Sequence, residues 1–138
     1  AMACALDEAS AWPARDGRPR FSADETDAVC FVPATAAAYA RRGFDHMGLV
    51  ARALSAELAL PLADVLVRPR ARDQRDLGRA ERAANLAHAM SAMDDLSGAR
   101  LLLVDDVATT GASLSEGARA LLARGASSVT ACALARVW

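Results

Sequence analysis

Apolar and polar positions follow two different periods along the chain, and each change of period marks a predicted element. Short, largely apolar runs bounded by turn residues predict buried strands, and they cover residues 28–32, 63–67, 101–104 and part of 128–137. Apolar residues at helical spacing predict helices from Phe44 to a stop at Pro61, over 80–93 and over 113–124. Strands and helices therefore alternate, which predicts an α/β fold with a mainly parallel central sheet flanked by helices.

Length and composition are those of one folded domain. The chain has 138 residues, 54% of them hydrophobic and 24% charged, which excludes a disordered chain. We expect a single α/β domain over residues 28–138 and a lead-in, partly loop, over residues 1–27. No apolar run approaches the roughly 20 residues of a membrane span, and no secretory signal is evident, so we expect no membrane association.

The cysteines indicate a reducing compartment. Cys4, Cys30 and Cys132 are odd in number and have no Cys-x-x-Cys spacing, which argues against a disulfide framework and a zinc ribbon. Cys30 and Cys132 lie in apolar runs and are interpreted as small core residues. The expected location is the cytoplasm.

Charge is balanced overall but uneven along the chain. The net charge of −1 argues against direct nucleic-acid binding. However, residues 68–85 carry six Arg against three acidic residues. This segment could bind pyrophosphate, close over a site or contact nucleic acid, or it could be a solvated loop and helix face.

The segment after the predicted strand 101–104 combines two carboxylates with an anion site. Asp105 and Asp106 follow the strand directly, and then come a hydroxyl-rich turn and a helix. Free backbone N–H groups at a helix start bind anions, and Thr109, Thr110 and Ser113 add hydroxyl donors. Carboxylates suit sugar hydroxyls or hydrated Mg²⁺. The combination predicts a ligand such as ribose 5-phosphate, against the alternative of an acidic strand end followed by a helix cap.

This segment resembles the phosphoribosyl-pyrophosphate (PRPP) signature of type I phosphoribosyltransferases. The resemblance implies that Asp105 and Asp106 hold the ribose hydroxyls and act in catalysis, while the turn wraps the 5-phosphate. The PRPP-binding residues it implies are Asp105, Asp106, Ala108, Thr109, Thr110, Gly111, Ala112 and Ser113. Mg²⁺ would come with PRPP, and no protein side chain would bind it directly.

Three arginines are candidates for binding pyrophosphate. Arg41 and Arg42 are expected in a loop after the strand 28–32, and Arg72 lies in the basic segment. Each could instead be solvated surface charge. Between the first two and the next helix, Phe44 is expected in the core, and His46 is either a proton-transfer group or a structural or exposed histidine. Tyr39 is the aromatic residue best placed to stack on a base.

Taken together, the patterns resemble the competence protein ComF family. The residues that carry this resemblance are Val32-Pro33, Arg41-Arg42-Gly43-Phe44, Arg72-x-Gln74, Arg82-x-x-Asn85 and the box from Val104 to Gly111. The chain departs from the family by lacking a Cys-x-x-Cys ribbon and by having Asp45-His46 where Asn-Gln often follows.

The ComF resemblance implies two functions. In the first, the protein transfers ribose 5-phosphate from PRPP to a nitrogen acceptor and releases pyrophosphate. In the second, it is a non-catalytic PRPP sensor or adaptor that serves DNA uptake, with a competence helicase as partner. The acceptor and the oligomeric state stay open, a homo-oligomer being one option.

Overall fold

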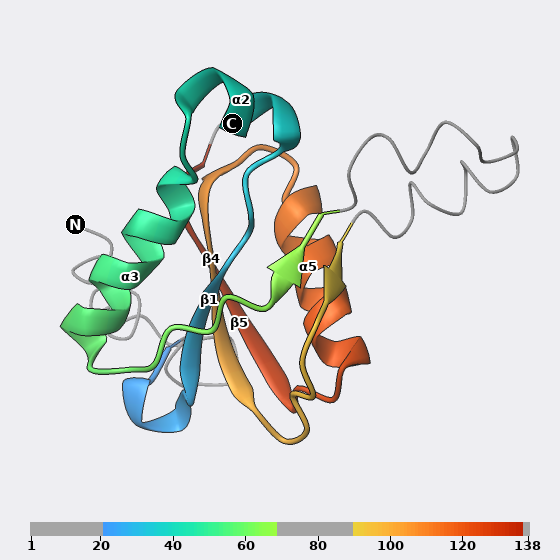
Figure 1. Ribbon diagram of the computed structural model, residues 1–138. Coiled ribbons are helices and arrows are strands. Elements are labelled where there is room, and N and C mark those ends of the chain that lie inside the picture. The colour runs from blue at the N-terminus through green and yellow to red at the C-terminus, as the bar shows by residue number, and fades with distance from the viewer. Residues whose placement is uncertain (1–20, 69–89, 137–138) are drawn as a thin grey trace, which may run out of the picture.

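A three-stranded parallel sheet forms the centre of the molecule. The computed structural model describes residues 21–68 and 90–136. In the sheet, β4 (Arg100–Ala108) lies between β1 (Ala28–Phe31) and β5 (Ser128–Arg136), and both pairings are parallel (Figure 1). The predicted α/β fold with a mainly parallel sheet is therefore confirmed.

Two helices cover the two faces of this sheet. The helix α3 (His46–Leu58) lies on one face and α5 (Ala112–Ala123) on the other (Figure 1). Successive side chains of a strand point to opposite faces, and the core is divided accordingly. Leu102 packs with Met47 and Leu54 of α3, whereas Leu103 packs with Leu121 of α5.

The helix α5 ends as the sequence predicts, at a glycine. Gly125 has φ +97, a conformation that L-residues adopt only with strain, and it follows the C-cap residue Arg124. The chain then returns to the sheet and enters β5, so the glycine sets the crossover from α5 to the edge strand.

A second, small sheet lies beside α5 and corrects one prediction. The strands β2 (Leu66–Val67) and β3 (Ser91–Ala92) pair antiparallel. The predicted helix over 80–93 is wrong at its end, and residues 80–89 lie outside the described part. Met90 and Ala92 are buried while Met93 is 62% exposed. This period of two is that of a strand, and it is set by packing against α5.

The predicted strand over 63–67 is shorter than expected. Only Leu66–Val67 forms β2, whereas Leu62 makes an isolated parallel bridge with Val29 of β1. The segment therefore leaves the large sheet before it joins the small one.

A short helix stands where the sequence analysis expects a loop. The helix α2 (Ala36–Arg42) begins at Thr35, whose side chain accepts a hydrogen bond from the Ala38 amide, and ends at Gly43 with φ +81. None of its residues is buried. Arg41 and Arg42 thus belong to the last turn of a helix, where cations favour the negative end of the helix dipole.

The segment before β1 also contributes to the core. A 3₁₀ turn η1 (Ala23–Glu25) precedes the strand, and Phe21 is buried in the cluster on the α3 side of the sheet. The domain boundary at residue 28 stays a prediction. Among the helices of residues 21–68 and 90–136, none has the length and apolar character of a membrane span.

The two described cysteines are free thiols with different exposure. Cys30 is fully buried, and burial raises its pKa to about 12. Cys132 is half-buried and packs against the cluster on the α3 side. Both are part of the packing, as predicted.

Candidate functional site

The central strand carries both predicted catalytic aspartates. The sequence analysis ends this strand at Val104, but β4 continues to Ala108, paired with β5. Asp105 and Asp106 are therefore strand residues whose side chains point to opposite faces of the sheet. Asp105 is only 8% exposed, and Asp106 is half-buried.

Asp106 lies in contact with α3. Its Oδ2 is 2.7 Å from Nε2 of His46, the first residue of α3, and its Oδ1 accepts a hydrogen bond of 2.7 Å from the Val107 amide. Burial raises the pKa of this carboxyl, but the hydrogen bonds from His46 and Val107 outweigh burial. The pKa of Asp106 is therefore lowered from its usual value.

The surroundings of Asp105 raise its pKa, in contrast to those of Asp106. Its Oδ1 accepts a hydrogen bond of 2.9 Å from the Asp106 amide. Burial raises the pKa of Asp105, the negative charge of Asp106 adds to this effect, and the positive charge of Arg68 opposes it. The two neighbouring carboxyls thus differ in the direction of their pKa shifts, which is a common property of functional sites.

Arg68 connects three elements of the site. It follows β2 directly, and its Nε donates to the Pro33 carbonyl at 2.9 Å, while its Nη2 lies 3.4 Å from Oγ of Ser113 in α5. In the sequence analysis Arg68 begins the basic segment 68–85, for which pyrophosphate binding is one option, but it is not named as a site residue. The signal was nevertheless present, because ligands of such sheets bind at the ends of strands.

Asp45 fixes the loop that follows β1. Its Oδ2 accepts a hydrogen bond of 2.9 Å from the Ala34 amide, and its Oδ1 caps α3 by accepting from the Met47 amide at 3.0 Å. This aspartate therefore ties the loop after β1 to the start of α3. The sequence analysis left the role of positions 45 and 46 open.

These groups surround a hollow of about 180 Å³ at the carboxyl edge of the sheet. Four predicted site residues line it: Arg42, Asp105, Asp106 and Ser113. Two residues that the predicted site set omits, His46 and Arg68, line it as well. The structure thus brings part of the predicted set together and adds one group from α3 and one from the end of β2.

The turn between β4 and α5 follows the hollow. Thr109 and Thr110 are exposed, and the Thr110 hydroxyl accepts a hydrogen bond of 3.3 Å from the Ala112 amide. Gly111 has φ +76 and precedes the first turn of α5 without a capping side chain. Together with Ala108, these residues form a turn whose backbone leads into a helix N-terminus, as the sequence predicts.

Several other predicted residues are not at the hollow. Arg41 is exposed on α2 and does not line it, and Arg72 lies outside the described residues. Phe44, expected in the core, is 49% exposed because it lies in the turn between α2 and α3, so this prediction is wrong. Tyr39 is 53% exposed on α2.

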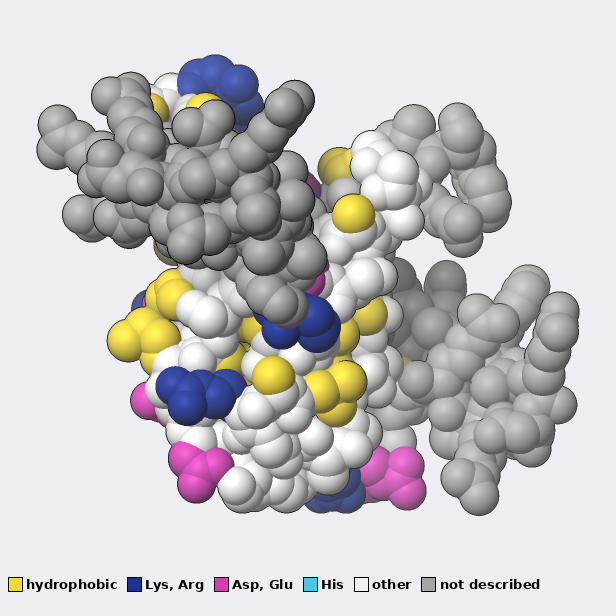
Figure 2. Space-filling view, turned by 90° about the vertical axis from the view of Figure 1, so that its right-hand side faces the viewer, with side chains coloured by type: hydrophobic (Ala, Val, Ile, Leu, Met, Phe, Trp, Pro, Cys, Tyr) yellow, Lys and Arg dark blue, Asp and Glu magenta, His cyan; other side chains and the backbone are white. Residues whose placement is uncertain are grey.

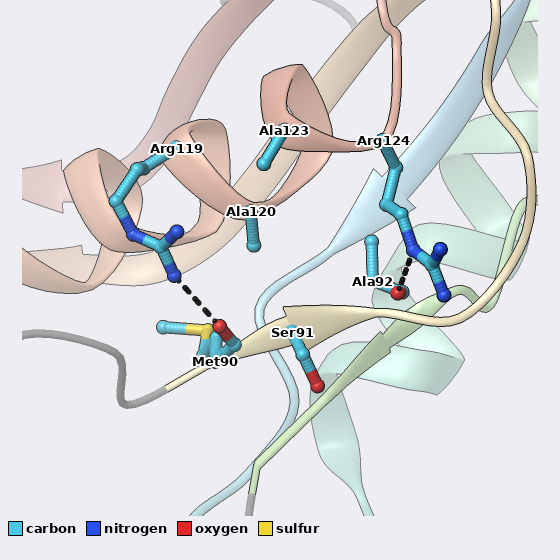
Figure 3. A pocket seen from close by; sticks show the side chains of 7 residues that line it. All are labelled: Met90, Ser91, Ala92, Arg119, Ala120, Ala123 and Arg124. Atoms are coloured by element: carbon cyan, nitrogen blue, oxygen red, sulfur yellow. Dashed lines mark hydrogen bonds between the residues drawn. The ribbon is translucent and has the colours of Figure 1, made fainter. Parts of the chain in front are cut away.

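A second hollow of about 280 Å³ lies between β3 and α5 (Figure 3). Its two arginines point across it and donate to carbonyls of the β3 segment: Arg119 to Met90 at 2.9 Å and Arg124 to Ala92 at 2.8 Å. Figure 2 views this side of the molecule and shows small separate groups of hydrophobic side chains between basic ones. The arginines hold β3 onto α5.

A family model for the phosphoribosyl transferase domain matches residues 40–137, more than half of the chain. The chain belongs to this family. The match includes both aspartates, the turn after them and α5, whose residue Ser113 lines the hollow with the aspartates. No curated protein sequence matches the chain.

Three solved enzyme structures have a similar fold. The glutamine phosphoribosylpyrophosphate (PRPP) amidotransferase from B. subtilis, complexed with ADP and GMP, has a TM-score of 0.58 at 22% identity, over 81% of this chain and 24% of that chain. An allosteric regulatory enzyme of purine biosynthesis has a TM-score of 0.57 at 22% identity, over 82% and 23%. Orotate phosphoribosyltransferase from Aeropyrum pernix has a TM-score of 0.51 at 21% identity, over 98% and 71%.

These similarities establish the fold of this phosphoribosyltransferase-family chain. The chain spans about a quarter of the length of the first two proteins. None of the three is described as a competence protein, so the resemblance to the ComF family stays a prediction.

Proposed function

We propose that the chain binds PRPP at the hollow and transfers its phosphoribosyl group to a nitrogen acceptor, with release of pyrophosphate. The observation that carries this proposal is the pair Asp105 and Asp106 at the end of the central strand, followed directly by a glycine turn and a helix N-terminus. Carboxylates accept hydrogen bonds from sugar hydroxyls, and a helix N-terminus binds a phosphate. A ribose 5-phosphate carries hydroxyl groups and a phosphate in one small molecule.

Each side of the hollow has its own role in the proposal. Asp105 and Asp106 accept hydrogen bonds from the ribose hydroxyls, and the turn over residues 108–112 with Ser113 binds the 5-phosphate. Arg42 and Arg68 also line the hollow and bind the pyrophosphate, since guanidinium groups bind phosphate oxygens in a bidentate manner. Arg41 and Arg72 stay candidates for the same role.

The reaction needs positioning and electrostatics more than a protein nucleophile. The bond between C1 and the pyrophosphate oxygen breaks, and its electron pair leaves with pyrophosphate. A bond forms between C1 and the acceptor nitrogen, which then loses a proton. Positive charge develops on the ribose ring in between, and a nearby carboxylate such as that of Asp106 stabilises that charge.

In this proposal Mg²⁺ reaches the site together with PRPP. Within residues 21–68 and 90–136 no group of three His, Cys, Asp or Glu side chains could hold a metal ion directly. Two adjacent carboxylates do suit the water shell of a magnesium ion that PRPP brings with it. When bound, Mg²⁺ neutralises charge on the leaving pyrophosphate.

The test is calorimetric titration of PRPP with Mg²⁺ into the wild type and into the double variant Asp105→Asn/Asp106→Asn. The wild type is expected to bind, and the folded double variant is expected to lose at least tenfold in affinity, because each lost charge-assisted hydrogen bond is worth about 1.5–3 kcal/mol. The matched control is Asp64→Asn/Asp94→Asn, which makes the same charge change at two exposed residues outside the hollow. Equal affinity in both double variants would contradict the proposal.

A second candidate function is that of a non-catalytic PRPP sensor or adaptor in DNA uptake. It is favoured by the resemblance to the ComF family and by Tyr39 and Phe44, two exposed aromatic residues next to Arg42 that a partner protein could contact. The two functions differ in turnover. Pyrophosphate release in the presence of ammonia, purine or pyrimidine acceptors supports the transferase, whereas PRPP binding without release supports the sensor.

A further inference from the structure

Arg42, His46 and Asp106 form a chain of contacts across one side of the hollow. They come from the last residue of α2, the first residue of α3 and β4, respectively. Arg42 Nη1 contacts Nδ1 of His46, and Nε2 of His46 lies 2.7 Å from Asp106 Oδ2. The roles proposed above use Arg42 and Asp106 but leave His46 without one.

The hydrogen-bond donors and acceptors of the three residues assign the tautomer of the imidazole. A guanidinium group has N–H donors only, so the ring nitrogen that faces Arg42 must accept. This contact assigns the acceptor role to Nδ1 and the ring proton to Nε2, which donates to Asp106.

The hydrogen bonds hold the Asp106 carboxylate in one orientation. His46 donates to Oδ2, and the Val107 amide donates to Oδ1. Each carboxylate oxygen can accept a further hydrogen bond, so both remain able to bind a hydroxyl group. The carboxylate is thus oriented before any ligand arrives, which reduces the entropy lost on binding.

We propose that His46 is a positioning residue: it holds the Asp106 carboxylate in one orientation at the hollow, and it links this carboxylate to Arg42. The proposal rests on the proposed function, because the carboxylate is positioned for the ribose of PRPP. It gives position 46 a role that depends on a side chain able to donate a hydrogen bond.

The charged groups around Asp106 influence its pKa and therefore the pH dependence of PRPP binding. His46 faces it from α3, Arg42 stands behind His46 at the end of α2, Asp105 is its neighbour in β4, and Arg68 lies near Asp105 at the end of β2. Loss of His46 removes a hydrogen bond that lowers the pKa of Asp106, while burial still raises it. The pKa of Asp106 is then expected to rise.

The experiment compares His46→Ala with His46→Gln in the full chain. Calorimetry with PRPP and Mg²⁺ is expected to show at least a tenfold loss of affinity in His46→Ala. As the pH is lowered, the affinity of this variant for PRPP should begin to fall at a higher pH than that of the wild type. His46→Gln, whose amide N–H can donate in place of Nε2, is expected to stay within about threefold of the wild type. Denaturant unfolding of each variant shows that the comparison is made on folded protein.

Carboxyl titration of Asp106 by ¹³C NMR in the ligand-free protein makes the test independent of PRPP. An upward shift in His46→Ala, reversed in His46→Gln, supports the positioning role. An unchanged titration, or equal losses of affinity in both variants, overturns it. If the wild type does not bind PRPP, the proposed function fails, and the titration alone decides the role of His46.

Discussion

The two adjacent aspartates show how one residue step changes the chemistry of a side chain. Asp105 continues the row of Leu103, toward α5, and Asp106 continues the row of Val104, toward α3. The first carboxyl is buried and its pKa is raised, whereas the second meets His46 and its pKa is lowered. A single pair of identical residues therefore supplies one carboxyl that ionises readily and one that ionises less readily.

Asp27 provides a test of pH dependence away from the site. Its carboxylate accepts three hydrogen bonds from Arg100, which joins the starts of β1 and β4, and the side-chain hydrogen bonds lower its pKa to about 2. We expect Asp27→Asn to lower the free energy of unfolding at pH 7. Because the pKa of Asp is about 4 in an unfolded chain, the advantage of the wild type should shrink as the pH falls from about 4 to about 2.

Urea unfolding of wild type and variant over this pH range measures the effect. The control is Asp24→Asn, a nearby exposed residue for which the same substitution should have little effect at any pH. A difference between wild type and Asp27→Asn that stays constant down to pH 2 would contradict the assigned role of the ion pair.

At the residue scale, the sequence predicted the groups that neighbour one another in the chain. Asp105, Asp106 and Ser113 could be found because the order of strand, carboxylates and helix is local. The contact between His46 and Asp106 spans 60 positions, and it depends on how α3 packs across the sheet. The strand-end rule did indicate the basic segment that begins at Arg68, but the sequence alone did not distinguish Arg68 from the other arginines of that segment, and Arg72 was chosen instead.

At the element scale, the errors occurred where short segments carry weak periodicity. The helix α2 has four alanines and buries no residue, so it offers no apolar face to detect. Its signals are local instead: a capping Thr35 and a Gly43 with positive φ. For β3 the opposite holds, because a helical spacing in the sequence is overruled by tertiary packing against α5.

The end of α5 allows a prediction with a matched control. A Cβ on Gly125 would lie 3.1 Å from the Cα and 3.2 Å from the backbone nitrogen of Ser97, and φ is +97. Gly98 also has a positive φ, +78, but open space around its Cβ position, and its amide donates to the Gly125 carbonyl at 2.9 Å. The two glycines thus lie side by side and differ in steric freedom.

We expect Gly98→Ala to cost about 1–2 kcal/mol in free energy of unfolding, the cost of a left-handed conformation for an L-residue. Gly125→Ala should cost about 1–3 kcal/mol more, because backbone atoms of Ser97 cannot move aside as a flexible side chain can. Guanidinium unfolding of both variants measures the difference. Equal losses of unfolding free energy in the two variants would mean that the close approach to Ser97 does not affect stability.

At the scale of the whole molecule, the alternation of strands and helices was sufficient to predict the fold class. A strand buried on both faces is wholly apolar, and residues 101–104 of β4 have this pattern because α3 and α5 cover the sheet from opposite sides. The same apolar pattern predicts that this strand is central in the sheet, as β4 is, but the strand order, with β1 and β5 on its two sides, was not predicted. It depends on crossovers between segments distant in sequence, which local patterns do not specify.

The central strand also predicts how the molecule unfolds. Leu102 and Leu103 are both 0% exposed, and they point into the α3-side and the α5-side core, respectively. Replacing either with Ala should cost about 2–5 kcal/mol, whereas Leu122→Ala at a 49% exposed position should cost much less. Since both cores share the backbone of β4, each variant should unfold in one transition with an unchanged denaturant slope. Two separate transitions in Leu102→Ala or Leu103→Ala would mean that the two cores are independent, and that the carboxyl edge between them is not held by one cooperative unit.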